Sequence, residues 1–177
     1  MMRHAVRQVV PLAATMVFAT AVLAASPASS PCVAIQISSA EETPRGGWGS
    51  TFSAAKTTDL TFMALFLSSA SGEHLLEFRV FTPRGFLYRS MKVPAVLAQV
   101  GSGTQQRKLA GYPHPVTVKA GSKVVLQGTT YWRVDVPFPV GGTDIAATSL
   151  YGTWKVQAYL DGSDQPCGPA ASFGIKP

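Results

Sequence analysis

Apolar and polar residues alternate along most of the chain beyond residue 30, and no stretch there keeps the period of an amphipathic helix. The segments "CVAIQIS", "HLLEFRVFT", "YWRVDVPF" and "TWKVQAYL" all alternate in this way, and turns rich in Gly and Pro separate them. A period of two with β-branched and aromatic residues is typical of strands that bury one face. We therefore predict about nine short strands and no α-helix.

Other segments refine this prediction. "DLTFMALFLSS" (59–69) is apolar on both faces, which favours a central strand. "TPRG" separates two strands of a hairpin, and the alternation in the second strand places Tyr88 and Met91 on opposite faces. "VTVKAGSKVVLQG" (116–128) indicates two strands with a turn at Gly121–Ser122. Residues 99–115 have little pattern and are predicted to be mostly loop, as is the connection after Phe138.

Two of these segments are similar to a known class of domain. The closing "GTWKVQAYLDG…ASFGIK" resembles the last two strands of bacterial extracytoplasmic immunoglobulin-like domains, and "FRVFTPRGFLYRS" resembles their central hairpin. The resemblance covers about half of the chain beyond residue 25. It implies an all-β fold, a single immunoglobulin-like antiparallel β-sandwich of about nine strands, and it implies no activity.

The N-terminus has the order of features that defines a secretory signal peptide. Arg3 and Arg7 precede an apolar run, and the small residues of "AVLAAS" follow it. We predict a signal peptide over residues 1–25, a sandwich domain over 26–177, and a secreted or periplasmic protein without a transmembrane segment after cleavage. An uncleaved anchor is the alternative, but the run is short for a span of about 20 residues and Pro11 interrupts it.

The chain contains two cysteines, Cys32 near the predicted first strand and Cys167 in the last loop. A pair of cysteines in an exported protein is normally oxidised, and two residues allow one connectivity, so we predict a Cys32–Cys167 disulfide. The immunoglobulin-like topology would bring these two positions to the same end of the sandwich. Two free thiols are the alternative. No C-x-x-C spacing or histidine cluster accompanies either cysteine, so no metal site is predicted.

The formal net charge of the whole chain is +6, and the loss of Arg3 and Arg7 with the signal peptide reduces it to +4. The other basic residues are scattered along the sequence, with Arg107–Lys108 as the one adjacent pair. Nucleic-acid-binding proteins usually concentrate their basic residues in a stripe or patch. We therefore predict that nucleic acid is not a partner.

No pattern of catalytic residues is found. A G-x-S-x-G motif and a calcium loop are absent, and turns or outward strand faces account for the carboxylates, so we predict no catalytic residue, cofactor or metal ligand and no enzymatic activity.

The candidate ligand contacts are Trp48 in "PRGGWGS", Tyr112 and His114 in "GYPHP", and Tyr159, which faces outward from its strand. Exposed aromatic side chains stack on sugars or anchor protein contacts, although each could instead fold back over an edge of the sandwich.

Taken together, these features predict an exported, non-enzymatic β-sandwich that binds another cell-envelope or extracellular protein. A carbohydrate-binding module that uses Trp48 and Tyr112 as a stacking platform for a polysaccharide is the alternative. A hydrolase is the third and least favoured hypothesis.

Overall fold

The computed structural model describes residues 31–42, 49–97, 104–108 and 113–177, and these residues form eleven strands and one four-residue helix. The strands are β1 (Cys32–Ser39), β2 (Thr51–Ser53), β3 (Asp59–Leu67), β4 (Gly72–Phe81), β5 (Leu87–Leu97), β6 (Thr104–Arg107), β7 (Val116–Ala120), β8 (Ser122–Leu126), β9 (Thr129–Pro139), β10 (Gly152–Leu160) and β11 (Ala171–Lys176), and the helix is α1 (Asp144–Ala147). The prediction of an all-β chain is confirmed.

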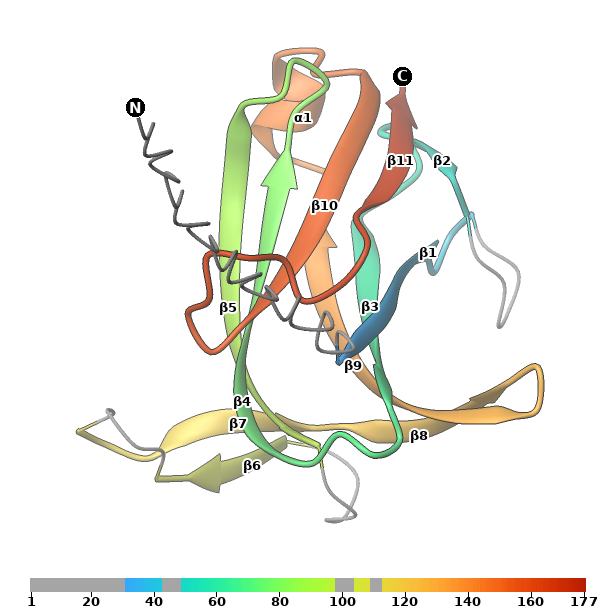
Figure 1. The fold of residues 1–177 in the computed structure, drawn as a ribbon. Helices are drawn as coiled ribbons and strands as arrows, with labels where there is room; N and C mark the ends of the chain where they lie inside the picture. Colours follow the sequence, from blue (N-terminus) through green and yellow to red (C-terminus); the bar gives the residue numbers. More distant parts are fainter. Residues whose placement is uncertain (1–30, 43–48, 98–103, 109–112) are drawn as a thin grey trace, which may run out of the picture.

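Two sheets face each other across a common core (Figure 1). The four-stranded sheet has the order β1–β3–β9–β8, and the seven-stranded sheet has the order β2–β11–β10–β4–β5–β7–β6. β3 lies between β1 and β9, so the segment that is apolar on both faces is a central strand, as predicted. Most neighbouring strands are antiparallel, but β2 pairs with β11 in parallel and β5 pairs with β7 in parallel.

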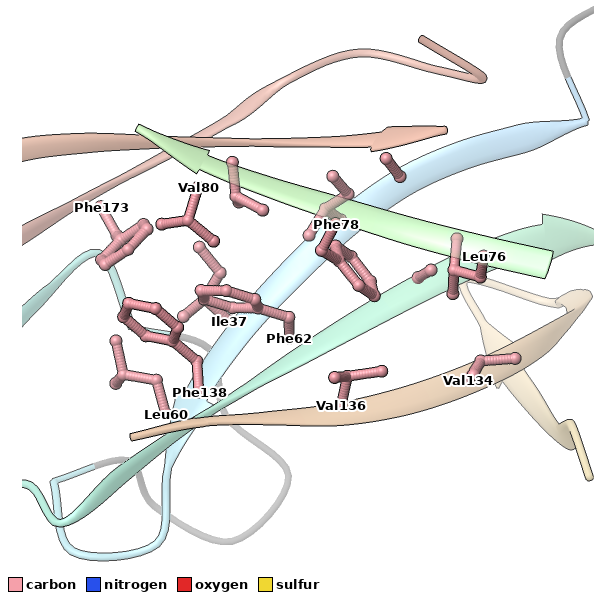
Figure 2. Close-up of a cluster of buried hydrophobic side chains, with 14 of the residues drawn as sticks. Ile37, Leu60, Phe62, Leu76, Phe78, Val80, Val134, Val136, Phe138 and Phe173 are labelled. Atoms are coloured by element: carbon pink, nitrogen blue, oxygen red, sulfur yellow. The ribbon is translucent and has the colours of Figure 1, made fainter. Parts of the chain in front are cut away.

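The core is aromatic at its centre. The ring of Phe62 on β3 lies 5.0 Å from the ring of Phe138 on β9 and 5.8 Å from that of Phe78 on β4, so side chains of both sheets interdigitate (Figure 2). Trp132 and Trp154 are both buried, as their strand faces predict, and the indole of Trp154 donates a hydrogen bond to the Leu150 carbonyl oxygen over 3.0 Å. Interlocked aromatic side chains of this kind supply most of the apolar area that holds two sheets together.

The segment from β7 to β8 differs from its prediction. Gly121 does not form a turn there, because β7 pairs with β5 in one sheet and β8 continues onto β9 in the other, along one end of the molecule (Figure 1). The Gly121 amide donates to the Val96 carbonyl oxygen over 2.9 Å, and a Cβ at this position would lie 3.2 Å from Leu97 Cδ2. Glycine therefore allows the strand to pass close to β5 as it changes sheets.

Three short elements carry no alternating pattern and were not predicted. β2 has three residues and is held in place by Glu42, whose carboxylate accepts hydrogen bonds from the Ser53 amide over 2.5 Å and the Thr57 hydroxyl over 3.0 Å. β6 lies within the segment predicted to be mostly loop, and α1 lies in the connection after β9. Their positions depend on tertiary partners rather than on local periodicity.

The β4–β5 hairpin is present, but its alternation shifts. Val80 is paired with Arg89 while Phe81 is paired with Leu87, so the second strand carries one extra residue at this point. This bulge turns Tyr88 toward the core, where Met91 also packs. The prediction that these two side chains lie on opposite faces is therefore wrong, because a bulge reverses the alternation on one side of it.

The predicted Cys32–Cys167 disulfide is confirmed, and it joins β1 of one sheet to the β10–β11 loop of the other, with the two Cα atoms 5.2 Å apart. The Cys32 amide also donates to the Cys167 carbonyl oxygen over 3.1 Å, and the Cys167 amide donates to the Ala158 carbonyl oxygen over 2.8 Å. A Cβ at Gly168 would overlap the Cys32 carbonyl oxygen, so this residue allows the loop to approach β1. Among the described residues, no helix is both long enough and apolar enough to cross a bilayer.

Candidate functional site

The residues predicted to contact a ligand do not form one site in the described part of the chain. Trp48 and Tyr112 lie outside the described residues, and His114 is exposed ahead of β7. Tyr159 is on the outward face of β10, as predicted, but it is only 6% exposed, which corrects the expectation of an open aromatic surface. The guanidinium carbon of Arg79 lies 4.0 Å from the centre of the Tyr159 ring and covers it.

A pocket lies instead on the outer face of the four-stranded sheet. It has a volume of about 400 Å³. Its walls come from β1, β3, β8, β9 and the turn between β8 and β9. The lining residues are Val33, Ala34, Gln36, Leu65, Leu126, Gln127 and Tyr131. We call this the β1–β8 pocket.

Strand register explains why these side chains gather on one face. Ala34 lies opposite Leu65, and Gln36 lies opposite Met63, so all four side chains point away from the core. A register shift between Cys32 and Ala34 allows the adjacent residues Val33 and Ala34 both to line the pocket. The result is an apolar wall on a face that would ordinarily be polar.

The β8–β9 turn closes the other side of the pocket. Gln127 and Gly128 have φ angles of +48° and +79°, the combination required by the tight two-residue turn that suits a twisted hairpin. Glycine adopts such angles readily, whereas a glutamine with positive φ is uncommon. The turn brings the Gln127 amide beside Leu126 and Tyr131 at the wall of the pocket.

One polar atom of the pocket is unsatisfied. Gln36 Oε1 is buried and has no hydrogen-bond partner within the described residues. Its neighbours on the same face are strongly buried as well, with Met63 at 1% and Leu65 at 2% exposure. Most buried polar atoms in proteins have a partner, and leaving one without a partner costs about 1–3 kcal/mol. Gln36 is therefore the residue of this pocket that structural stability alone does not account for.

Two charged residues on this face, Arg133 and Asp135, form an ion pair with each other. Arg133 lies opposite Leu65 and donates from Nε to Asp135 Oδ1 over 2.6 Å, and this hydrogen bond to the carboxylate raises the pKa of the guanidinium. Lys119 Nζ reaches across from β7 and donates to the Asp135 carbonyl oxygen over 2.6 Å. The seven residues that line the pocket include no carboxylate, imidazole, thiol or amine. The walls of the pocket therefore carry no formal charge.

The outer face of the seven-stranded sheet holds a different polar group. Glu77 is buried and accepts hydrogen bonds from Arg79 Nε over 2.8 Å and from Ser90 Oγ over 2.7 Å. The hydrogen bond from Arg79 is the main reason that the pKa of Glu77 lies below its ordinary value, and the Ser90 hydroxyl lowers it further, whereas burial opposes both. Within the residues that the structure describes, no three His, Cys, Asp or Glu side chains approach closely enough to hold a metal ion.

The sequence contains a partial signal for the β1–β8 pocket. The apolar residues on both faces of 59–69 indicate that the outward side of β3 is buried, and Met63 and Leu65 are those outward residues. Gln36 itself gives no such signal, because a glutamine in an alternating strand is typical of a solvent-facing position. The pocket was therefore missed at the residue that distinguishes it.

Comparison with known proteins gives a distant structural likeness. No protein-family model matches the sequence, and no curated protein matches it. The structure is similar to part of Pseudomonas fluorescens alkylpurine DNA glycosylase AlkC bound to DNA containing an abasic site analog, with a TM-score of 0.39 and 11% sequence identity. The match covers 85% of this chain and 31% of that chain.

This finding overturns two predictions made from the sequence. Because the similar protein is a glycosylase bound to DNA, we no longer predict a non-enzymatic module that contacts an envelope protein or a polysaccharide, nor the absence of a nucleic-acid partner. The second prediction relied on the scatter of basic residues along the sequence, but strand pairing can bring such residues together in space. At a TM-score of 0.39 the likeness carries no argument for an activity, and we assign none from it.

Proposed function

We propose that this protein binds a small, neutral and mostly apolar molecule in the β1–β8 pocket, and that the molecule donates a hydrogen bond to Gln36. The observation that carries the proposal is the Gln36 side-chain oxygen, which is buried at an apolar wall without a partner among the described residues. A ligand with one N–H or O–H group would satisfy it and bury its apolar remainder against Val33, Leu65 and Leu126.

The dimensions and chemistry of the pocket support this class of ligand. Sites for small molecules usually have volumes of about 300–1,000 Å³ and combine apolar walls with a few polar groups that orient the ligand. The β1–β8 pocket has about 400 Å³, and its polar groups are the Gln36 and Gln127 amides and the Tyr131 hydroxyl. The paired state of Arg133 and Asp135 leaves no free charge beside Leu65 to select a charged ligand.

We also infer an immunoglobulin-like fold. Strand order is the support: β1–β3–β9–β8 corresponds to the A–B–E–D sheet of such domains, and β11–β10–β4 corresponds to their G–F–C sheet. β5 next to β4 then takes the place of the additional strand of variable-type domains.

We infer that residues 1–25 are a secretory signal peptide, although they lie outside the described residues. The Cys32–Cys167 disulfide supports export, because such bonds persist in oxidising compartments. The ligand is then expected to reach the protein outside the cytoplasm.

The test uses two molecules that differ in one hydrogen-bond donor. Indole and benzothiophene have nearly the same shape, but only indole has an N–H group. Both are titrated into the oxidised, isotope-labelled protein, and affinities are taken from the NMR amide shifts of Ala34, Leu65 and Tyr131. We expect both to bind, with indole tighter by roughly 2- to 10-fold, the value of one net hydrogen bond.

Variants show whether Gln36 is the acceptor. Gln36→Leu should remove the preference for indole while binding of benzothiophene persists. Gln106→Leu is the matched control, since Gln106 is exposed on β6 and donates to the Thr117 hydroxyl, away from the pocket. The absence of shifts at the pocket residues with either molecule would overturn the proposed function, and an indole preference that survives in Gln36→Leu would overturn the role of Gln36.

A further inference from the structure

Two of the three large apolar side chains that are strongly exposed in the described residues are adjacent at the tip of the β4–β5 hairpin. Phe86 is 70% exposed and Leu87 is 55% exposed. The hairpin tip lies at the same end of the sandwich as α1 (Figure 1). Single exposed apolar residues are common on protein surfaces, but a pair at a projecting turn is a frequent feature of interaction sites.

The tip is held in one conformation. Thr82 organises it, since its carbonyl oxygen accepts from the Gly85 amide over 2.9 Å and its amide donates to the Phe86 carbonyl oxygen over 2.9 Å. The Thr82 hydroxyl also accepts from the Phe86 amide over 3.2 Å. At the base of the tip Pro83 packs against Gly152 of β10, so closely that a Cβ on Gly152 would lie 3.0 Å from Pro83 Cβ. Phe86 and Leu87 are therefore presented on a fixed turn.

Basic side chains surround this apolar pair. Arg84 lies in the turn itself, and Arg89 and Lys155 are exposed on β5 and β10. Lys155 Nζ lies 5.0 Å from the ring centre of Phe81, which is paired with both Lys155 and Leu87, so a cation and two apolar side chains form one row across the outer face.

These basic groups are not neutralised by ion pairs. In the described part of the chain no carboxylate lies within salt-bridge distance of Arg84, Arg89 or Lys155. Asp144 is the nearby acidic residue, because it lines a small cleft together with Arg89, but the two do not form an ion pair. The hairpin tip therefore keeps a net positive charge next to its apolar side chains.

We propose that the β4–β5 hairpin tip binds the surface of an anionic lipid bilayer. Phe86 and Leu87 enter the boundary between headgroups and acyl chains, and Arg84, Arg89 and Lys155 contact the anionic headgroups. Peripheral proteins combine apolar insertion with basic residues in this way, since neither contribution alone gives stable binding. A soluble polyanion would use the cations but would gain nothing from Leu87. This proposal does not depend on the ligand of the β1–β8 pocket.

The experiment measures co-sedimentation of the oxidised protein with two kinds of vesicle. One contains phosphatidylglycerol and phosphatidylcholine in equal parts, and the other contains phosphatidylcholine alone. We expect binding to the anionic vesicles that weakens as salt is added. Phe86→Ser/Leu87→Ser should lower the affinity roughly 10-fold or more, because two large apolar side chains no longer leave water. Arg84→Gln/Arg89→Gln should lower it about 5-fold for each residue removed.

Matched variants separate the tip from the rest of the surface. Val125→Ser changes a side chain that is 64% exposed on β8, and Lys56→Gln/Lys108→Gln removes two exposed cations elsewhere; both should bind like the unchanged protein. All of these positions are on the surface, so unchanged melting temperatures are expected. In Phe86→Trp, bromine-labelled lipids should quench more fluorescence than in the unchanged protein.

Two outcomes would overturn this proposal. One is equal binding to both vesicles, or none to either. The other is tight binding to a short DNA duplex that depends on Arg84 and Arg89 while Phe86→Ser/Leu87→Ser has no effect, because the tip would then be a polyanion site.

Discussion

The outer faces of the two sheets differ in whether a buried polar atom has a hydrogen-bond partner. On the seven-stranded sheet, Glu77 receives hydrogen bonds from Arg79 and Ser90, and Arg79 in turn covers Tyr159. On the four-stranded sheet, Gln36 is surrounded by apolar neighbours and its side-chain oxygen has no partner among the described residues. Both residues occupy outward positions in alternating strands, so the alternation alone does not distinguish them.

This difference separates a face whose buried polar side chain is satisfied from the face that carries the proposed ligand pocket. A fully satisfied polar network fixes side chains in place, and loss of any member leaves the others without partners. An unsatisfied polar atom lowers stability, and its removal should raise it. Substitution of the polar residue should therefore lower the unfolding free energy on the seven-stranded face and raise it on the four-stranded face.

Removal of the disulfide should disturb the two faces unequally. Cys32→Ser/Cys167→Ser removes a cross-link that spans 135 residues, for which the loss of chain entropy predicts about 5 kcal/mol of lost stability. β1 is an edge strand and carries Val33, Ala34 and Gln36, so the β1–β8 pocket should loosen first. Denaturant unfolding measures the total loss, and amide hydrogen exchange locates it.

The exchange pattern decides this prediction. Amides of β1 should exchange much faster in the double variant, whereas those of Glu77 and Arg79 on β4 should keep most of their protection. Wild-type protein reduced with a thiol provides the same comparison if the variant accumulates poorly. Equal acceleration in β1 and β4 would show that the disulfide stabilises the whole sandwich rather than the pocket face.

Loss of charge at Glu77 should destabilise the seven-stranded face. Glu77→Gln leaves Arg79 without its carboxylate, and we expect a loss of about 1–3 kcal/mol at neutral pH. Because the folded pKa of Glu77 is lower than its unfolded value of 4.5, this contribution is complete above about pH 4.5 and is lost as the pH falls through the folded pKa. Urea unfolding over a range of pH measures both quantities.

Wild type and Glu77→Gln should therefore become more alike in stability at acidic pH. The difference in unfolding free energy between wild type and Glu77→Gln should be largest at neutral pH and should shrink below about pH 4.5. Asp164→Asn, an exposed position in the β10–β11 loop, is the control and should change stability little at either pH. A Glu77→Gln penalty that is the same at neutral and acidic pH would contradict the prediction.

Substitution of Gln36 should raise the stability of the protein, and this effect should be the smallest of the three. Gln36→Leu replaces an amide without a partner by an aliphatic side chain of similar volume on an apolar face, and we expect the protein to gain up to about 1 kcal/mol. Thermal unfolding of the ligand-free protein measures the change, with Gln106→Leu as the control. A loss of stability in Gln36→Leu would mean that the two faces do not differ as described.

Much of the fold could be predicted from the sequence because it is encoded locally. The inward positions of Trp132 and Trp154 follow from the alternation of their strands, and the Cys32–Cys167 bond follows from there being two cysteines in a chain with an exported pattern. Elements that depend on distant partners could not be found in this way. β2, for example, is placed by Glu42 and by β11 rather than by its own three residues.

The candidate site was much less predictable. Exposure of Tyr159 was inferred from its outward position, but a strand's own sequence does not show that Arg79, on the neighbouring strand, will cover it. Gln36 is the opposite case, an outward polar residue whose neighbours across the strands are apolar. Register decides both outcomes, and a one-residue change such as the bulge beside Val80 is enough to alter it.

The disulfide also has a consequence for the order of events during synthesis. Cys32 leaves the ribosome 135 residues before Cys167, a delay of roughly 7–27 s at about 5–20 residues per second. Throughout this interval the first thiol has no native partner, and β1 cannot be locked to the last loop. Newly made chains therefore depend on noncovalent pairing of β1 with β3 until the C-terminal segment arrives. During that time the Cys32 thiolate can attack any disulfide that it meets, which forms a mixed disulfide and releases the other sulfur as a thiol.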